Sequence, residues 1–212
     1  MAQLLRSAKS GNDWSDNELF AFNISIQDVD VATFFGVPGP QLPPTTVSPV
    51  ILNNTHRPPP PAVISKEDRP FFRYLERANT HEAAVNDFAG HILRMLDFDD
   101  SDRSIATRRE LSFTMCGSRV WAKADIVGLD SDAEYSLVVQ DGSRTPVTDE
   151  PKAQLIASAI AAFVENNGFR VPPLPQQTIP AMTMAGPCPV FYKVPVTQSL
   201  VDTLVTARYP LS

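Results

Sequence analysis

Residues 110–140 read ELSFTMCGSRVWAKADIVGLDSDAEYSLVVQ, and this stretch predicts three consecutive β-strands. Apolar residues dominate two segments, 110–116 and 120–129, and the intervening Gly117-Ser118-Arg119 is suited to a hairpin turn. A third strand is predicted for 135–140, where three consecutive apolar residues indicate a strand covered on both faces. The middle of the chain is therefore expected to be β-structure.

Helices are predicted on both sides of these strands in the sequence. The clearest is 151–167, because Pro151 suits the first turn of a helix and Asn166-Asn167-Gly168 is typical of a helix end. Another is predicted for 80–96, where apolar residues recur at helical spacing and Thr80 could cap the first turn. Its apolar stripe comprises Val85, Phe88, Ala89, Ile92 and Leu96. The other predicted elements are a helix at 67–79, strands at 181–185 and 190–196, and a final helix at 197–207.

The order helix, three strands, helix, strand predicts an α/β (α+β) domain, in which strands and helices share one core. A length of 212 residues with 43% hydrophobic residues suits one such domain with an arm. We expect residues 1–65 to be an irregular, proline-rich arm that packs on the core, and residues 66–212 to be the domain. The run HRPPPP at 56–61 is expected to be a stiff polyproline spacer. The alternative is that it is a ligand for a protein partner.

The charge and the apolar runs exclude several classes of protein. The net charge is -6, with 18 Lys and Arg against 24 Asp and Glu, which argues against a protein that coats nucleic acid. An enzyme that engages nucleic acid through a local groove and metal ions remains compatible with this balance. No apolar run is long enough for a signal peptide or a membrane span, and two cysteines suit a reducing compartment. We therefore expect a cytoplasmic or nuclear protein that does not associate with membranes.

Two aspartates at neighbouring strand ends are the candidates for a metal site. Strand periodicity places Lys123, Asp125 and Val127 on one face, and Asp141 follows the next strand. One or two carboxylates with several waters suit Mg²⁺ or Mn²⁺. The alternative is that Asp125 is a strand-end residue and Asp141 belongs to a turn. Glu82 continues the apolar stripe of its helix, where it is either a rim residue or one aimed at the site.

This arrangement resembles the PD-(D/E)XK superfamily of restriction-endonuclease-like proteins. The resemblance rests on the helix with Glu82, the hairpin ending in Asp125, the strand ending in Gln140-Asp141, and the helix opening Pro151-Lys152-Ala153-Gln154. Residues 80–210 are also similar to uncharacterised proteins of mushroom-type fungi, which typically read VQEDKR where this chain reads VQDGSR. The superfamily core is a helix, three strands, a helix and a fourth strand, and its site hydrolyses phosphodiester bonds with a divalent metal.

The resemblance assigns a role to each matching position. Asp125 and Asp141 match the two metal-binding acids, Gln154 the supporting helix glutamine, and Glu82 the acid of the first helix. Ser143 stands where the superfamily has its catalytic lysine. A relocated lysine could restore that charge, and Lys123 is the candidate on the strand of Asp125. Arg144 beside Ser143 and Lys193 on the last strand are further cations of this kind.

Three functions follow as hypotheses. The first is a nuclease that cleaves DNA or RNA with Mg²⁺ or Mn²⁺ and has weak activity because the lysine is missing. The second is a catalytically degenerate nuclease fold that binds a partner without cutting. The third is an interaction module whose protein partner docks on the proline-rich arm.

Overall fold

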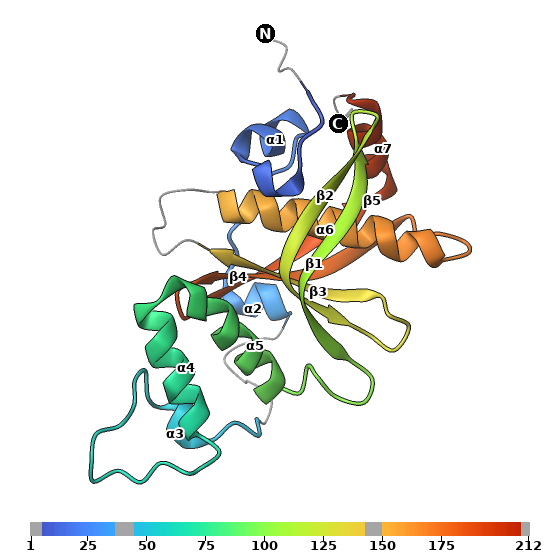
Figure 1. Ribbon diagram of the computed structural model, residues 1–212. Coiled ribbons are helices and arrows are strands. Elements are labelled where there is room, and N and C mark those ends of the chain that lie inside the picture. The colour runs from blue at the N-terminus through green and yellow to red at the C-terminus, as the bar shows by residue number, and fades with distance from the viewer. Residues whose placement is uncertain (1–5, 37–44, 143–149, 209–212) are drawn as a thin grey trace.

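The computed structural model describes residues 6–36, 45–142 and 150–208, and the side chains of Asp141 and Glu150 lie outside this description. The chain is a mixed α/β fold with a five-stranded sheet (Figure 1). Its elements, in chain order, are η1 (Gly11–Asp13), α1 (Asp16–Ala21), α2 (Val31–Phe35), α3 (Pro49–Leu52), α4 (Arg69–Thr80), η2 (Glu82–Ala84), α5 (Val85–Met95), β1 (Ser104–Met115), β2 (Ser118–Leu129), β3 (Tyr135–Gly142), α6 (Glu150–Phe169), β4 (Gln176–Ala185), β5 (Cys188–Thr197) and α7 (Gln198–Thr206).

The strands lie in the sheet in their sequence order, β1-β2-β3-β4-β5. The pairs β1–β2, β2–β3 and β4–β5 are antiparallel, whereas β3 and β4 are parallel. Parallel neighbours need a crossover connection, and α6 supplies it between β3 and β4. The predicted three strands, helix and strand are therefore present in this order.

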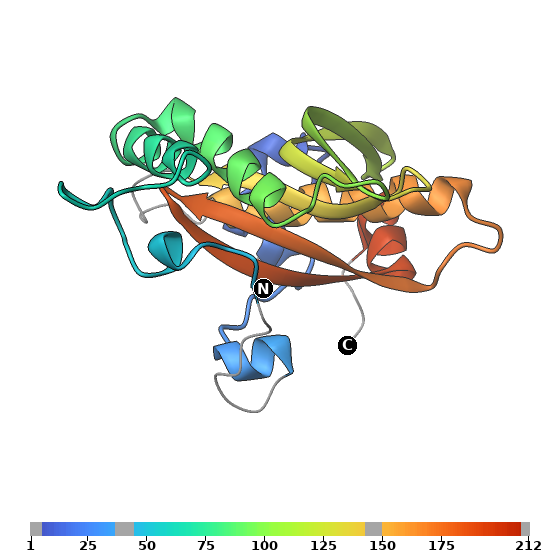
Figure 2. The ribbon, with the colours of Figure 1, turned by 90° about the horizontal axis from the view of Figure 1, so that it is seen from below.

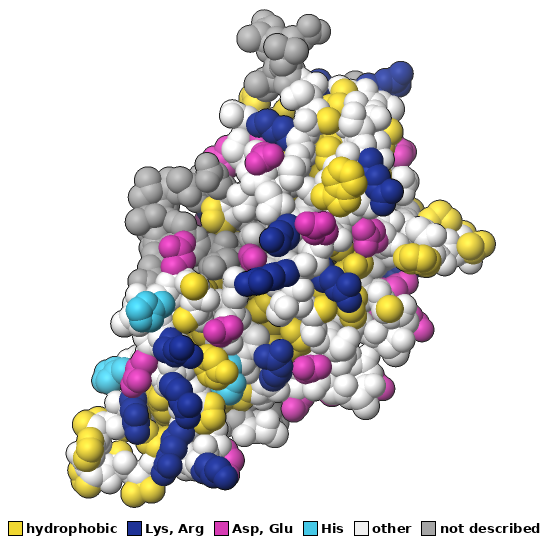
Figure 3. Space-filling model, viewed as in Figure 1, with side chains coloured by type: hydrophobic (Ala, Val, Ile, Leu, Met, Phe, Trp, Pro, Cys, Tyr) yellow, Lys and Arg dark blue, Asp and Glu magenta, His cyan; other side chains and the backbone are white. Residues whose placement is uncertain are grey.

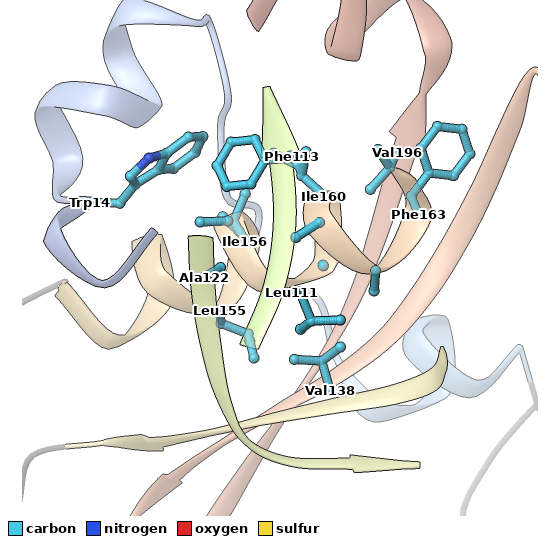
Figure 4. Close-up of a cluster of buried hydrophobic side chains, with 14 of the residues drawn as sticks. Trp14, Leu111, Phe113, Ala122, Val138, Leu155, Ile156, Ile160, Phe163 and Val196 are labelled. Atoms are coloured by element: carbon cyan, nitrogen blue, oxygen red, sulfur yellow. The ribbon is translucent and has the colours of Figure 1, made fainter. Parts of the chain in front are cut away.

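Helices cover both faces of the sheet, so the molecule has two apolar cores (Figures 1 and 2). Along β3, Val138 belongs to the core under α6, whereas Leu137 and Val139 belong to the core under α4 and α5. This alternation confirms that β3 is covered on both faces, as its run of apolar residues predicts. The core under α6 is shown in Figure 4, where Ile156, Ile160 and other α6 side chains face the sheet.

The beginning of the chain contributes to the core under α6. Trp14, Leu19 and Phe22 are buried there, and the Trp14 ring packs edge-on against Phe113 of β1 at a centroid distance of 6.0 Å. Residues 6–36 are less irregular than predicted, because α1 and α2 form where local caps are available. The Ser15 amide donates a hydrogen bond to the Glu18 carboxylate before α1, and Asp30 accepts one from the Thr33 amide before α2.

The segment around η1 lies along an edge of β2 that β3 does not reach. Pairing with β3 covers β2 only from Ile126 onward. Beyond that point the Ser10 hydroxyl donates to the Trp121 carbonyl, and the Asn12 side-chain oxygen accepts from the Lys123 amide. A Cβ at Gly11 would lie 2.5 Å from the Cβ of Ala122, so only glycine permits this close approach. The segment thus satisfies polar backbone groups that an open strand edge would leave exposed.

Two predicted helix boundaries are wrong at the junction of α4 and α5. Thr80 does not cap the second helix, because it is the last residue of α4 and its hydroxyl donates to the carbonyls of Glu76 and Arg77. The chain then passes through η2 before α5 begins at Val85. Leu96 lies beyond α5 and is exposed, while Leu93 takes the buried position.

The last two strands are longer than the predicted 181–185 and 190–196, and β4 and β5 begin upstream of Pro180 and Pro189. Pro180 lies in β4 just before its pairing with β3 begins at Ala181. Pro189 and Pro195 lie on the edge strand β5. At these positions a missing amide removes few ladder hydrogen bonds, so the prolines are compatible with the sheet. In the described parts of the chain no helix combines the length and apolar character needed to cross a membrane.

Replacing Thr197 with alanine is expected to lower the free energy of unfolding by about 1 kcal/mol. The Thr197 hydroxyl accepts a hydrogen bond from the Leu200 amide at 3.1 Å and so caps α7. Urea denaturation followed by circular dichroism measures the change. Thr206→Ala in the same helix is the matched control, because the Thr206 side chain is exposed and its hydroxyl donates to the Asp202 carbonyl one turn earlier. Equal losses in the two variants would contradict the capping role.

Candidate functional site

The candidate site is centred on a pair of side chains from two adjacent strands. Asp125 lies on β2 and Gln140 on β3, directly before Asp141. The Gln140 amide nitrogen donates to the Asp125 carboxylate at 3.0 Å. The pairing of Ile126 with Val139 sets this register, because the next residues along the two strands are Asp125 and Gln140. The hydrogen bond fixes one oxygen of the carboxylate and orients the amide.

The side-chain oxygen of Gln140 is the second polar atom of this pair. Gln140 is buried, and its side-chain oxygen has no hydrogen-bond partner among the described residues. A buried carbonyl oxygen without a partner is unfavourable, so a group that accepts its lone pairs would be stabilised there. Carboxylate and amide oxygens are ligands of Mg²⁺ and related cations. Asp125 and Gln140 together therefore present oxygen ligands suited to a divalent cation.

The partner strand on the other side of Asp125 is distorted. Thr107 pairs with Ile126 and Arg109 pairs with Ala124, so Arg108 lies opposite Asp125 in the ladder. Arg108 has a φ of 54°, in the left-handed region that costs a residue with a side chain about 1–2 kcal/mol. Among the described residues with side chains and a positive φ, Arg108 is the one that lies inside a strand, and strained residues of this kind concentrate at functional sites.

The strand periodicity assumed for β2 is broken at the same place. Ala122, Ala124 and Val127 all pack in the core under α6, whereas Ile126 packs under α4 and α5. Lys123 is exposed and follows Ala122, so it lies on the face opposite Val127. The prediction that Lys123, Asp125 and Val127 share one face is therefore wrong for Lys123 and Val127. The irregularity between residues 124 and 126 is the physical reason.

Asn12 links two of the predicted site residues to each other. Its side-chain oxygen accepts from the Lys123 amide at 2.8 Å, and its carbonyl accepts from the Gln154 amide nitrogen at 2.9 Å. Gln154 is thus bound to the η1 segment, and the exposed Lys123 lies beside the same segment. This gives Gln154 a structural role in holding the beginning of the chain against β2 and α6.

The other predicted residues lie in different places. Glu82 is exposed in η2, at the junction between α4 and α5. Lys193 donates to the Phe34 carbonyl and lies over the Phe34 ring, 4.9 Å from its centroid. The backbone of Asp141 pairs with Met184 of β4, but its side chain, and all of Ser143 and Arg144, lie outside the described residues. Asp125 and Gln140 are thus the pair whose contact is described.

Within the described residues no three His, Cys, Asp or Glu side chains gather closely enough to hold a metal ion. A cation at this site would therefore depend on Asp125, the Gln140 oxygen, water and the Asp141 carboxylate. The sequence prediction missed Gln140 as a candidate ligand. The pairing of β2 with β3 is the signal that could have found it. This pairing places Gln140, the residue before Asp141, beside Asp125.

Comparisons of this chain with models of protein families, with curated proteins and with solved structures find no match. The function is therefore argued from the site itself and from the order of the elements.

Proposed function

We propose that the chain is a PD-(D/E)XK-like protein that binds a divalent cation at Asp125 and hydrolyses phosphodiester bonds in DNA or RNA slowly. The observation that carries the proposal is the Asp125–Gln140 pair on neighbouring strands, in which the Gln140 amide nitrogen donates to the Asp125 carboxylate while the buried oxygen of the same amide has no described partner. The order α5, β1–β3, α6, β4 supports it, since it matches the helix, three strands, helix and strand expected of that superfamily.

Asp125, the Gln140 oxygen and Asp141 are the groups that would hold Mg²⁺ or Mn²⁺. A cation bound there supplies an acidified water and neutralises charge that develops on the phosphate. The Asp125 carboxylate would bind the cation, while the Gln140 amide nitrogen fixes the orientation of that carboxylate. Ser143 has no positive charge to offer the phosphate, and loss of one such positioned group costs about 10²–10³ in rate. Slow hydrolysis is the expected consequence.

A second candidate function is a binding protein on the same scaffold that does not cleave. Two observations favour it. Ser143 replaces the superfamily lysine, and Gln154, the supporting glutamine, is bound to the Asn12 carbonyl instead. Loss of activity would leave a protein that keeps the fold but uses the former catalytic side chains for structural contacts.

Calorimetric titration of Mn²⁺ and Mg²⁺ separates these functions when it is combined with a cleavage assay on labelled DNA and RNA. We expect wild type to bind Mn²⁺ and to cleave slowly, and Asp125→Asn to lower cleavage by about 10²-fold or more, because the ligand charge is lost at nearly constant shape. Asp132→Asn is the matched control, since Asp132 is exposed in the turn between β2 and β3.

The control variant is expected to behave as wild type in both assays. Cation binding without cleavage would support the second function. Cleavage that Asp125→Asn leaves unchanged would contradict the assignment of Asp125.

A further inference from the structure

Helix α4 carries a row of arginines on its solvent face. Arg69, Arg73 and Arg77 follow one another at intervals of four residues and are all exposed, while Phe72 and Leu75 are buried on the opposite side. Lys66, which is also exposed, precedes the helix. We call Lys66, Arg69, Arg73 and Arg77 the basic stripe. Figure 3 shows the corresponding gathering of Lys and Arg side chains over the part of the molecule where Figure 1 places α4.

The basic stripe is unfavourable for the helix that carries it. Like charges four residues apart repel, and α4 has two such pairs, Arg69 with Arg73 and Arg73 with Arg77. The ion pairs found among the described residues involve other basic side chains, and none neutralises the stripe. The acid inside α4 is Glu76, which follows Arg73 by three residues and lies on the same face of the helix. A protein with a net charge of -6 thus keeps a row of four basic side chains beside a single acid of α4.

The spacing and chemistry of the stripe suit a chain of phosphates. Four residues of α-helix advance about 6 Å, so the three guanidinium groups form a row of regularly spaced charges. Arginine presents a rigid planar fork that binds a phosphate through two hydrogen bonds, which a lysine cannot do. Arg69 is partly anchored, because its Nε donates to the Ile64 carbonyl at 3.3 Å.

Next to the stripe the surface is hollowed. A depression of about 530 Å³ is lined by Arg57, Arg69, Glu76 and prolines of the run at 58–60. Arg57 is exposed and adds a fifth positive charge to this region. At its other end α4 leads to η2, and Figures 1 and 2 both place the α4–α5 junction beside the ends of β3 and β4. The stripe therefore runs towards the strand end where Asp141 follows Gln140.

We infer that the basic stripe binds the phosphodiester backbone of a nucleic acid and directs it towards Asp125 and Gln140. The inference that the stripe directs the nucleic acid towards Asp125 and Gln140 rests on the proposed function. The inference that the stripe binds nucleic acid does not. The guanidinium groups recur at regular intervals along one helix, and this favours the regularly spaced phosphates of one nucleic-acid strand over a lipid surface. The cost of the repulsion along α4 is offset when the phosphates neutralise the row.

Binding of fluorescein-labelled single-stranded and duplex oligonucleotides to the full chain, followed by fluorescence anisotropy in EDTA, tests the inference without any cleavage. Wild type is expected to bind with an affinity that falls steeply with salt. Arg73→Glu is expected to weaken binding about tenfold or more and to reduce the slope of log K against log salt by about 1. Arg208→Glu, an exposed site beyond α7, is the matched control with the same net charge and is expected to bind as wild type.

Thermal unfolding of the same variants separates binding from folding. A glutamate at position 73 gains Arg69 and Arg77 as partners four residues away but is repelled by Glu76 three residues on, so Arg73→Glu is expected to unfold at about the same temperature as wild type. Equal affinities of the two variants, no oligonucleotide binding by wild type, or binding only to phosphatidylserine vesicles would each overturn the inference. Oligonucleotide binding that depends on Arg73, together with no cleavage in Mn²⁺, would support the stripe and remove the proposed hydrolysis.

Discussion

Replacing Trp14 with alanine is expected to lower the free energy of unfolding by about 3–5 kcal/mol, as removal of a large buried aromatic side chain usually does. Trp14 is fully enclosed by the core under α6, where it stacks on Phe22 and meets Phe113 edge-on. Figure 4 shows the indole directed from the η1 segment towards Phe113. The variant leaves a cavity between this segment and β1, so both parts lose their contacts.

Urea denaturation measures the loss, and Trp14→Phe is the matched variant. The indole nitrogen of Trp14 has no hydrogen-bond partner among the described residues. Phenylalanine removes this buried donor and keeps most of the aromatic contact, so we expect Trp14→Phe to lose less than half as much stability as Trp14→Ala. A loss below about 1 kcal/mol in Trp14→Ala would show that the beginning of the chain does not pack into the core.

Replacing Gly11 with alanine is expected to destabilise the protein by about 1–3 kcal/mol, because one added methyl group overpacks a fixed contact. The new Cβ would lie 2.5 Å from the Cβ of Ala122 and 3.0 Å from that of Ala157. Neither neighbour has a flexible side chain that could move aside. The η1 segment would have to withdraw from β2 and α6, and the hydrogen bonds of Asn12 would lengthen with it.

Gly168→Ala tests whether this cost comes from the contact or from the loss of glycine itself. Gly168 lies near the end of α6, and a Cβ there would meet nothing within 4 Å. Alanine is the better helix former by about 1 kcal/mol, so this control is expected to be neutral or stabilising. Thermal and urea unfolding of both variants give the comparison. Similar stabilities for the two alanine variants would mean that η1 is not held close to β2.

The order of helices and strands could be predicted because local patterns determine it. The apolar segments around Gly117 gave the first two strands, and Pro151 marked the start of the long helix. The boundary at Thr80 was wrong because a threonine hydroxyl near a helix end can also bond to carbonyls of the preceding turn. A hydroxyl residue at such a position fits both interpretations, and only the packing of the two helices decides between them.

The candidate site was predicted only in part. Asp125 was identified as one of two aspartates at the ends of neighbouring predicted strands, but Gln140 was missed because its importance comes from the pairing of two strands. The side chain of Lys123 was assigned to the wrong face relative to Val127 because regular alternation fails where Arg108 adopts a positive φ. No pattern in a single strand reveals a distortion in its neighbour. The docking of Asn12 depends in the same way on residues far along the chain.

The position of Asn12 has a consequence for how the chain reaches its native state. Its two hydrogen-bond partners, Lys123 and Gln154, follow it by 111 and 142 residues. During synthesis, which proceeds from the N-terminus at about 5–20 residues per second, the segment around Trp14 leaves the ribosome seconds before either partner exists. Until then its apolar side chains have no core to pack against in the nascent chain. Contacts of such long sequence separation are also slow to form, so the docking of η1 is expected to be a late event in folding.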